Sequence, residues 1–243
     1  MSDRAADAHV EVRGELERFL HSTEFSCLGA RAALKRGSLT HRHYPVIGEP
    51  ESARLHHADL LAHSRELPKK LTGRSFLTFV ATFDEPARMD EHEFERVLWR
   101  HLQLVHDLDS REHGVQQGAS SDPEESNFGF HVGGHAFFVA GMHPGSSRAT
   151  RRFSLPALAI TANEQFMALG EKFLSLQERI RAREVTNNGS VNPSFTRYEY
   201  ERPARHFSGR LTEPDWKCPY RSRHTERSAD PQIGETCSGD ASL

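Results

Sequence analysis

The sequence predicts an α+β fold, a single domain in which a mixed or antiparallel sheet with a Gly-Gly hairpin packs against several helices. Three observations predict it. Apolar residues recur at helical spacing in several separate segments, and strand-like apolar runs lie between these segments. Two of the runs flank Gly133-Gly134, a two-residue link that is typical of a β-hairpin. The 243 residues, 36% of them hydrophobic, suffice for one domain with a modest core.

The spacing of apolar residues in the first part of the chain predicts three helical segments and one strand. The helices are expected over residues 11–21, 29–37 and 52–67, with Ser52 as the N-cap of the third. Residues 40–50, rich in His and Pro, are expected to form a loop. The apolar run at residues 75–83 leaves neither face polar, which is typical of a central strand.

The second part predicts a helix, a hairpin, a third strand and a long helix. Asp90 and Glu93 form a capping box before a clear apolar stripe, and Asn163 is expected to cap the long helix. The hairpin and the strand after it are expected at residues 127–143 and 153–161. We expect a disordered N-terminus at residues 1–10, one domain over 11–220, and a disordered tail at 221–243.

Charge and composition exclude several classes of protein. The formal charge of −3 lacks the basic excess of a dedicated nucleic-acid binder, and no apolar stretch approaches the ~20 residues of a membrane span. The three cysteines form no CxxC pair, which argues against a zinc ribbon or a covalent haem site. We therefore expect a cytoplasmic protein, able to form a homodimer, with no nucleic-acid or membrane partner.

The hairpin carries the first candidate site. Pairing across the Gly-Gly link puts Phe130 opposite Phe137, and strand alternation places both on the same face as His143. A lone imidazole at the end of an aromatic wall, followed by arginines, suits a noncovalent haem with His143 as axial ligand to the iron. The alternative is an ordinary strand-end histidine.

Arginines and cysteines supply the other candidates. Arg148, Arg151 and Arg152 suit carboxylates or phosphates, or else form a solvated basic loop. A weaker anion site is formed by Arg205 and Arg210. Two cysteines with aromatic neighbours, Cys27 and Cys218, could be thiolate ligands, although buried structural cysteine is the commoner case.

Several segments resemble the YqcI/YcgG family, more closely its guanitoxin-type branch of haem-dependent N-hydroxylases. In chain order they are FSCLGARAALKRG, LWRHLQLVHDLD, SDPEESNFGF, VGGHAFFVAGMHPGSSRATRRF, NEQF, GSVNP, ARHFSGR and WKCPY. The resemblance runs from about Glu17 to Tyr220. It implies a haem b enzyme that uses O₂ and an unidentified electron donor to hydroxylate a guanidine or amine nitrogen of a small amino-acid-like substrate.

Matched by position, the resemblance implies roles for individual residues. His143 is the iron ligand, with Cys218 as the alternative, and Phe130 and Phe137 belong to the dry wall. The arginines at 148, 151, 152, 205 and 210 hold carboxylates. Asn163 departs from the family pattern next to Glu164, and the candidate partners of a cationic substrate are Glu164, Glu199 and Glu201. Two further hypotheses stay open: a noncatalytic haem-binding or haem-sensing protein, and an interaction protein without cofactor.

Overall fold

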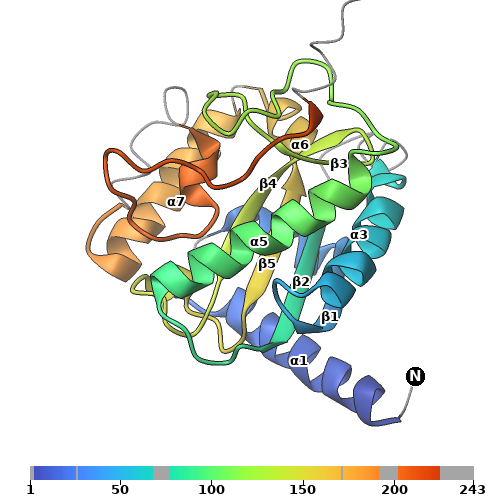
Figure 1. Ribbon diagram of the computed structural model, residues 1–243. Coiled ribbons are helices and arrows are strands. Elements are labelled where there is room, and N and C mark those ends of the chain that lie inside the picture. Colours follow the sequence, from blue (N-terminus) through green and yellow to red (C-terminus); the bar gives the residue numbers. More distant parts are fainter. Residues whose placement is uncertain (1–2, 26, 68–76, 171, 192–201, 225–243) are drawn as a thin grey trace, which may run out of the picture.

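The computed structural model describes residues 3–25, 27–67, 77–170, 172–191 and 202–224. Within these residues the chain forms a five-stranded sheet in the order β1-β2-β5-β4-β3 (Figure 1). Strands β1 and β2 are parallel, and the other pairs are antiparallel. The strands are β1 (Leu39–Val46), β2 (Thr78–Glu85), β3 (Phe130–Val132), β4 (His135–Met142) and β5 (Ala157–Ala162). The α+β prediction with its mixed sheet is confirmed.

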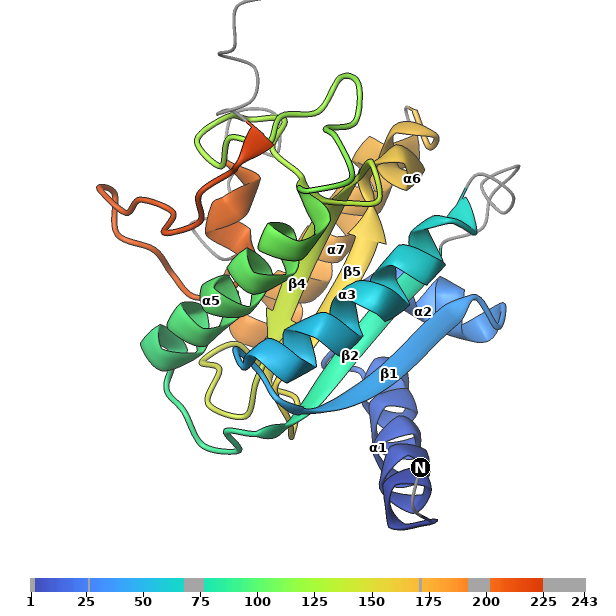
Figure 2. The same ribbon diagram turned by 45° about the vertical axis from the view of Figure 1, so that its right-hand side comes forward.

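Helices lie on both faces of this sheet. Figure 2 shows α3 and α5 across one face and α1, α2 and α7 on the other. The helices are α1 (Asp3–His21), α2 (Leu28–Lys35), α3 (Pro50–Ser64), α5 (Glu91–Asp109), α6 (Asn163–Met167) and α7 (Lys172–Asn188), with 3₁₀ turns η1 (Ala149–Arg151) and η3 (Pro203–His206). None of the helices in the described part of the chain is long and apolar enough to cross a membrane.

The larger core lies between the sheet and α5. Most of the apolar stripe of α5 is fully buried there (Phe94, Leu98, Leu102 and Val105), together with the hairpin residues Phe130, Phe137 and Val139. Burial of each such side chain contributes about 1.5–3 kcal/mol to folding. At Gly141 a Cβ would come within 2.6 Å of the Phe94 ring, so that α5 and β4 approach as closely as the backbone permits. This face of β4 is therefore filled by the protein's own side chains.

Local sequence signals fix several elements as expected. Asp90 accepts a hydrogen bond from the Glu93 backbone and Glu93 returns one to the Asp90 N–H, so the capping box that starts α5 is confirmed. The hairpin has the predicted register, with Val132 opposite His135. Its two glycines have φ of +61° and +77°, a region that favours glycine.

The loop predicted at residues 40–50 is wrong, because most of it is β1. Two of its histidines contact the neighbouring strand: His41 Nε2 and His43 Nδ1 both lie within 2.9 Å of the Thr82 hydroxyl on β2. Ser52 is not an N-cap. Helix α3 starts after Glu49, with Pro50 in its first turn, and the Ser52 hydroxyl accepts from the Val46 N–H.

Three boundaries also need correction. Helix α1 begins at Asp3, so residues 3–10 are helical and not disordered. The long helix predicted from Asn163 is divided into α6 and α7, and Gly170 between them has a φ of +51°. Residues 221–224 pack on α5, where Arg223 forms an ion pair with Asp107, whereas residues 225–243 lie outside the described part of the chain.

Candidate functional site

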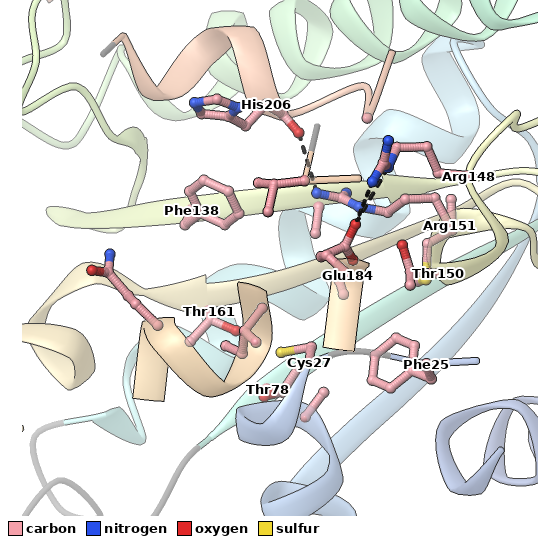
Figure 3. Close-up of a pocket in the computed structure, with 18 of the residues that line it drawn as sticks. Phe25, Cys27, Thr78, Phe138, Arg148, Thr150, Arg151, Thr161, Glu184 and His206 are labelled. Carbon is pink, nitrogen blue, oxygen red and sulfur yellow. Dashed lines mark hydrogen bonds and ion pairs between the residues drawn. The ribbon is translucent and has the colours of Figure 1, made fainter. Parts of the chain in front are cut away.

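A hollow opens on the face of the sheet opposite α5, between β2, β4 and β5 on one side and α2, η1 and α7 on the other (Figure 3). It contains about 1220 Å³ of atom-free space, a volume that includes the part open to solvent. The described residues of the lining are mostly apolar, with a few polar and charged groups among them.

Cys27 lines the hollow at the start of α2. It is the N-cap residue, and its side chain caps no backbone N–H. Figure 3 shows its sulfur directed towards the Thr161 side of the hollow. Cys27 is an exposed free cysteine, and the N-terminus of the helix adds partial positive charge beside it.

Two of the predicted arginines, Arg148 and Arg151, reach the same hollow from η1 and the residue before it. Arg148 forms an ion pair with Glu184 of α7 at 3.1 Å. Arg151 donates instead to two backbone carbonyls, those of Gly141 at 2.9 Å and His206 at 3.4 Å. Burial lowers the pKa of the Arg151 guanidinium, and the nearby Glu184 carboxylate and Cys27 sulfur act in the opposite direction.

The charge of Arg151 has no carboxylate of its own among the described residues. Glu184, the acid in the described lining, is already engaged by Arg148. Buried charges are costly unless they are paired. The described part of the lining therefore carries an excess positive charge that suits an anionic group on a ligand.

Two more polar residues face the hollow. Thr150 is 3% exposed, and its Oγ1 has no hydrogen-bond partner among the described residues, which leaves an unsatisfied hydroxyl in the lining. His206 is also buried. Burial, followed by the charges of Arg151 and Arg205, lowers the pKa of His206 to about 3, so that its imidazole is neutral at physiological pH.

The chemistry of these residues fits a haem. Cysteine sulfur and neutral imidazole are common protein ligands of haem iron, and the lining contains one cysteine, Cys27, and one histidine, His206, among the described residues. Apolar walls and buried guanidinium groups suit the macrocycle and its carboxylates. Of the two iron-ligand candidates, Cys27 has the side chain that points inwards, whereas the ring of His206 is turned away from Arg151 (Figure 3).

His143 does not line this hollow. Its ring is 1% exposed and stacks on Phe94 of α5, with ring centroids 4.4 Å apart and an interplanar angle of 17°. Burial lowers the pKa of His143, which Glu91, Asp90 and the Met89 backbone partly offset. The expectation that His143, Phe130 and Phe137 share one cavity with the arginines is wrong, because α5 packs on their face of the sheet.

The remaining predicted residues have other partners. Cys218 packs against the core under α5, where burial raises the pKa of its thiol. Arg210 forms a largely buried ion pair with Glu95 and a second ion pair with the exposed Glu213. Arg205 donates to the carbonyls of Pro214 and Trp216, and Arg152 to those of Ser146 and Ser147. These three arginines therefore hold loops and do not line the hollow.

The residues expected to meet a cationic substrate are not brought together. Glu164 lies 3.1 Å from His135 Nδ1 and does not line the hollow. Asn163 lies beside Gly129, at which a Cβ would come within 2.9 Å of the Asn163 amide. Glu199 and Glu201 lie outside the described residues, as do Asn192 and Pro193.

The sequence does not predict Thr150 or Glu184 as site residues, nor His206 as a candidate iron ligand. Thr150 sits within the arginine run, which is the signal that could have found it. Glu184 belongs to a helix with charged residues along much of its length, so that nothing in the sequence distinguishes it from its neighbours.

The comparisons with known proteins give one match. A family model described as the YqcI/YcgG family matches residues 16–221, most of the chain. No curated protein and no solved structure matches.

Proposed function

The chain belongs to the YqcI/YcgG family, and from this premise we propose that it is a haem-dependent oxygenase. Its reaction is the hydroxylation of a guanidine or amine nitrogen in a small amino-acid-like substrate. The resemblance of the sequence to guanitoxin-type N-hydroxylases supports the reaction. The location is supported by the hollow itself, whose apolar walls hold the Cys27 sulfur. Among the described residues, the Thr150 hydroxyl there has no hydrogen-bond partner and the Arg151 guanidinium has no carboxylate of its own.

The reaction balances with O₂ and two electrons from an external one-electron carrier. One N–H bond of the substrate and the O–O bond break, and an N–O bond forms. The second oxygen atom leaves as water after taking up two protons. Bound haem supplies the activation of O₂, a chemistry that protein side chains alone do not provide.

The residues of the hollow have separate roles in this proposal. The Cys27 sulfur would hold the haem iron, in place of His143, with His206 as the alternative ligand. Arg151 binds a haem carboxylate, which supplies the counter-charge that its environment lacks. Phe138, Met142 and Ile180 exclude water from the reacting nitrogen.

Thr150 has a role that does not require charge. Its Oγ1 is buried at the lining of the hollow and has no hydrogen-bond partner among the described residues. A ligand oxygen in the hollow could accept that hydrogen bond, and an otherwise unpaired hydroxyl gains the most from such a contact.

The test begins with an absorption spectrum of the protein expressed with haem supply, before and after reduction. The haem-loaded protein then receives a reductant, O₂ and a panel that contains arginine, its analogues and lysine. We expect a product heavier by one oxygen atom, and the matched variant Thr150→Val keeps the haem spectrum but makes less product. A haem spectrum with no product from any compound favours the noncatalytic haem-sensing alternative. Colourless protein contradicts both.

A further inference from the structure

Glu184 lies in the hollow without a role in the account above. It is on α7, its side chain is 16% exposed, and Figure 3 shows it between Arg148 and Cys27. It is the acid in the described part of the lining. A carboxylate that faces an apolar hollow needs partners for both of its oxygens.

The described hydrogen-bond donors to the Glu184 carboxylate all bind the same oxygen, Oε2. Arg148 donates Nε and Nη2 to Oε2 at 3.3 and 3.1 Å, and Asn188 donates Nδ2 to the same atom at 3.1 Å. None of the described residues donates a hydrogen bond to Oε1. A bidentate arginine would normally use both oxygens of a carboxylate, and here one oxygen is left open.

We propose that Oε1 of Glu184 accepts an N–H from the cationic end of the substrate and selects guanidinium or ammonium groups over neutral ones. The inference deepens the proposed function and rests on it for the identity of the site. Inside an apolar hollow a charge-assisted hydrogen bond is stronger than in water. A neutral analogue would desolvate Oε1 with a smaller gain in return.

The charges of the described lining fit a haem carboxylate together with a cationic group of the substrate. Arg148 and Glu184 pair with each other, and Arg148 also donates to the Ser190 carbonyl. The positive charge of Arg151 is the excess. If a haem carboxylate binds Arg151, Oε1 of Glu184 remains as the open acceptor for a cation. The anionic group of the haem would then meet Arg151, and the cationic group of the substrate would meet Glu184.

The alternative is a purely structural role, in which the Arg148–Glu184 ion pair only stabilises the packing of α7 on η1. Helix α7 has no fully buried side chain among its described residues, and its other contacts are polar, such as those of Arg183 with the Thr23 and Phe25 carbonyls. A purely structural role would depend on Arg148 as much as on Glu184, because the ion pair needs both side chains. Selection of a cation depends on the carboxylate alone.

The experiment compares the dissociation constants of L-arginine and L-citrulline, which differ in having a guanidinium or an uncharged urea group. Titration calorimetry on the full chain measures both. Wild type should prefer arginine, and Glu184→Gln should lower that preference about tenfold or more by weakening arginine alone. The matched control Glu178→Gln removes the same charge from an exposed position of α7 outside the lining and keeps the preference.

Arg148→Met separates the two readings, because it removes the ion pair and leaves the carboxylate in place. We expect it to retain the preference for arginine. The inference is overturned by equal affinities in wild type, by an undiminished preference in Glu184→Gln, or by equal loss in Arg148→Met. All of these titrations can be repeated on haem-free protein, so that a failure of haem binding and a failure of this inference are distinguishable.

Discussion

The ring of His143 stacks on the ring of Phe94 with centroids 4.4 Å apart, on the face of the sheet opposite to the hollow that Cys27 lines. His143 and Cys27, two of the candidate iron ligands, therefore lie in different environments. His143 is part of the packed layer under α5, whereas Cys27 faces a hollow with Arg151 and Thr150. Because Cys27 and Arg151 both line the hollow, our proposal puts the cofactor on the α7 side of the sheet.

The first prediction concerns Arg151. Arg151→Met should weaken haem binding about tenfold or more, because a charge-assisted contact to a haem carboxylate is lost. Arg152→Met is the matched control, since Arg152 donates to the Ser146 and Ser147 carbonyls outside the hollow. Titration of haem into each apoprotein, followed by absorbance, gives both affinities. Equal losses in the two variants would argue that the hollow does not hold the cofactor.

The second prediction concerns the contact that holds the hairpin turn. Asp109 at the end of α5 is fully buried, and its two oxygens accept from the Gly133 N–H at 3.0 and 3.1 Å. Oδ1 also lies 3.0 Å from His57 Nε2. Asp109→Asn should lower the free energy of unfolding by about 1.5–3 kcal/mol, the range for hydrogen bonds to a charged group.

Asp107 provides the control on the same helix. Its ion pair with Arg223 is at the surface, with side chains 29% and 57% exposed. Asp107→Asn should therefore cost less than about 1 kcal/mol in urea unfolding. A cost for Asp107→Asn as large as that for Asp109→Asn would mean that burial of the turn contact contributes little.

The third prediction is a loss of stability in mild acid. Burial lowers the pKa of His101 to about 3 and that of His106 to about 4, so the folded protein keeps both neutral where the unfolded chain binds protons. His101 Nδ1 accepts from the Gly48 N–H, and Nε2 lies 2.8 Å from His56 Nδ1. The stabilising effect is complete above pH ~6.5 and is lost as the pH falls towards 3–4.

Between pH 6.5 and pH 5, His101 alone should reduce the unfolding free energy by up to about 2 kcal/mol. Urea unfolding at pH 7 and pH 5 measures the change. His101→Asn removes the titrating group, and its side-chain oxygen can still accept from the Gly48 N–H, so the difference between the two pH values should shrink. An unfolding free energy that is equal at both pH values in wild type would refute the prediction.

Local signals in the sequence were sufficient for part of the fold. The capping box at Asp90 and the Gly133-Gly134 turn each depend on residues close in the chain, and both were predicted correctly. Strand β1 was missed because the partner that satisfies His41 and His43, Thr82, lies about 40 residues further on. The side-chain polarity of such a strand resembles that of a loop until its neighbour is known.

The site was predictable only in its charged part. The arginine cluster indicated the correct segment, and Arg148 and Arg151 do line the hollow. Strand alternation separated the two faces of β4, but it could not tell which face α5 would cover. Cys27 is a ligand candidate on the sequence, but the haem pattern and the family resemblance both favour His143. Glu184 meets Arg148 only through the packing of α7 on η1, a contact between residues 36 apart.

The most direct test of the proposed site is the absorption and electron paramagnetic resonance spectrum of the haem-loaded protein, compared among Cys27→Ser, His206→Gln, His143→Gln and Cys218→Ala. We predict a thiolate-type spectrum in wild type that only Cys27→Ser abolishes, while the other three variants keep it. An imidazole-type spectrum that survives Cys27→Ser and disappears in His143→Gln would contradict the account.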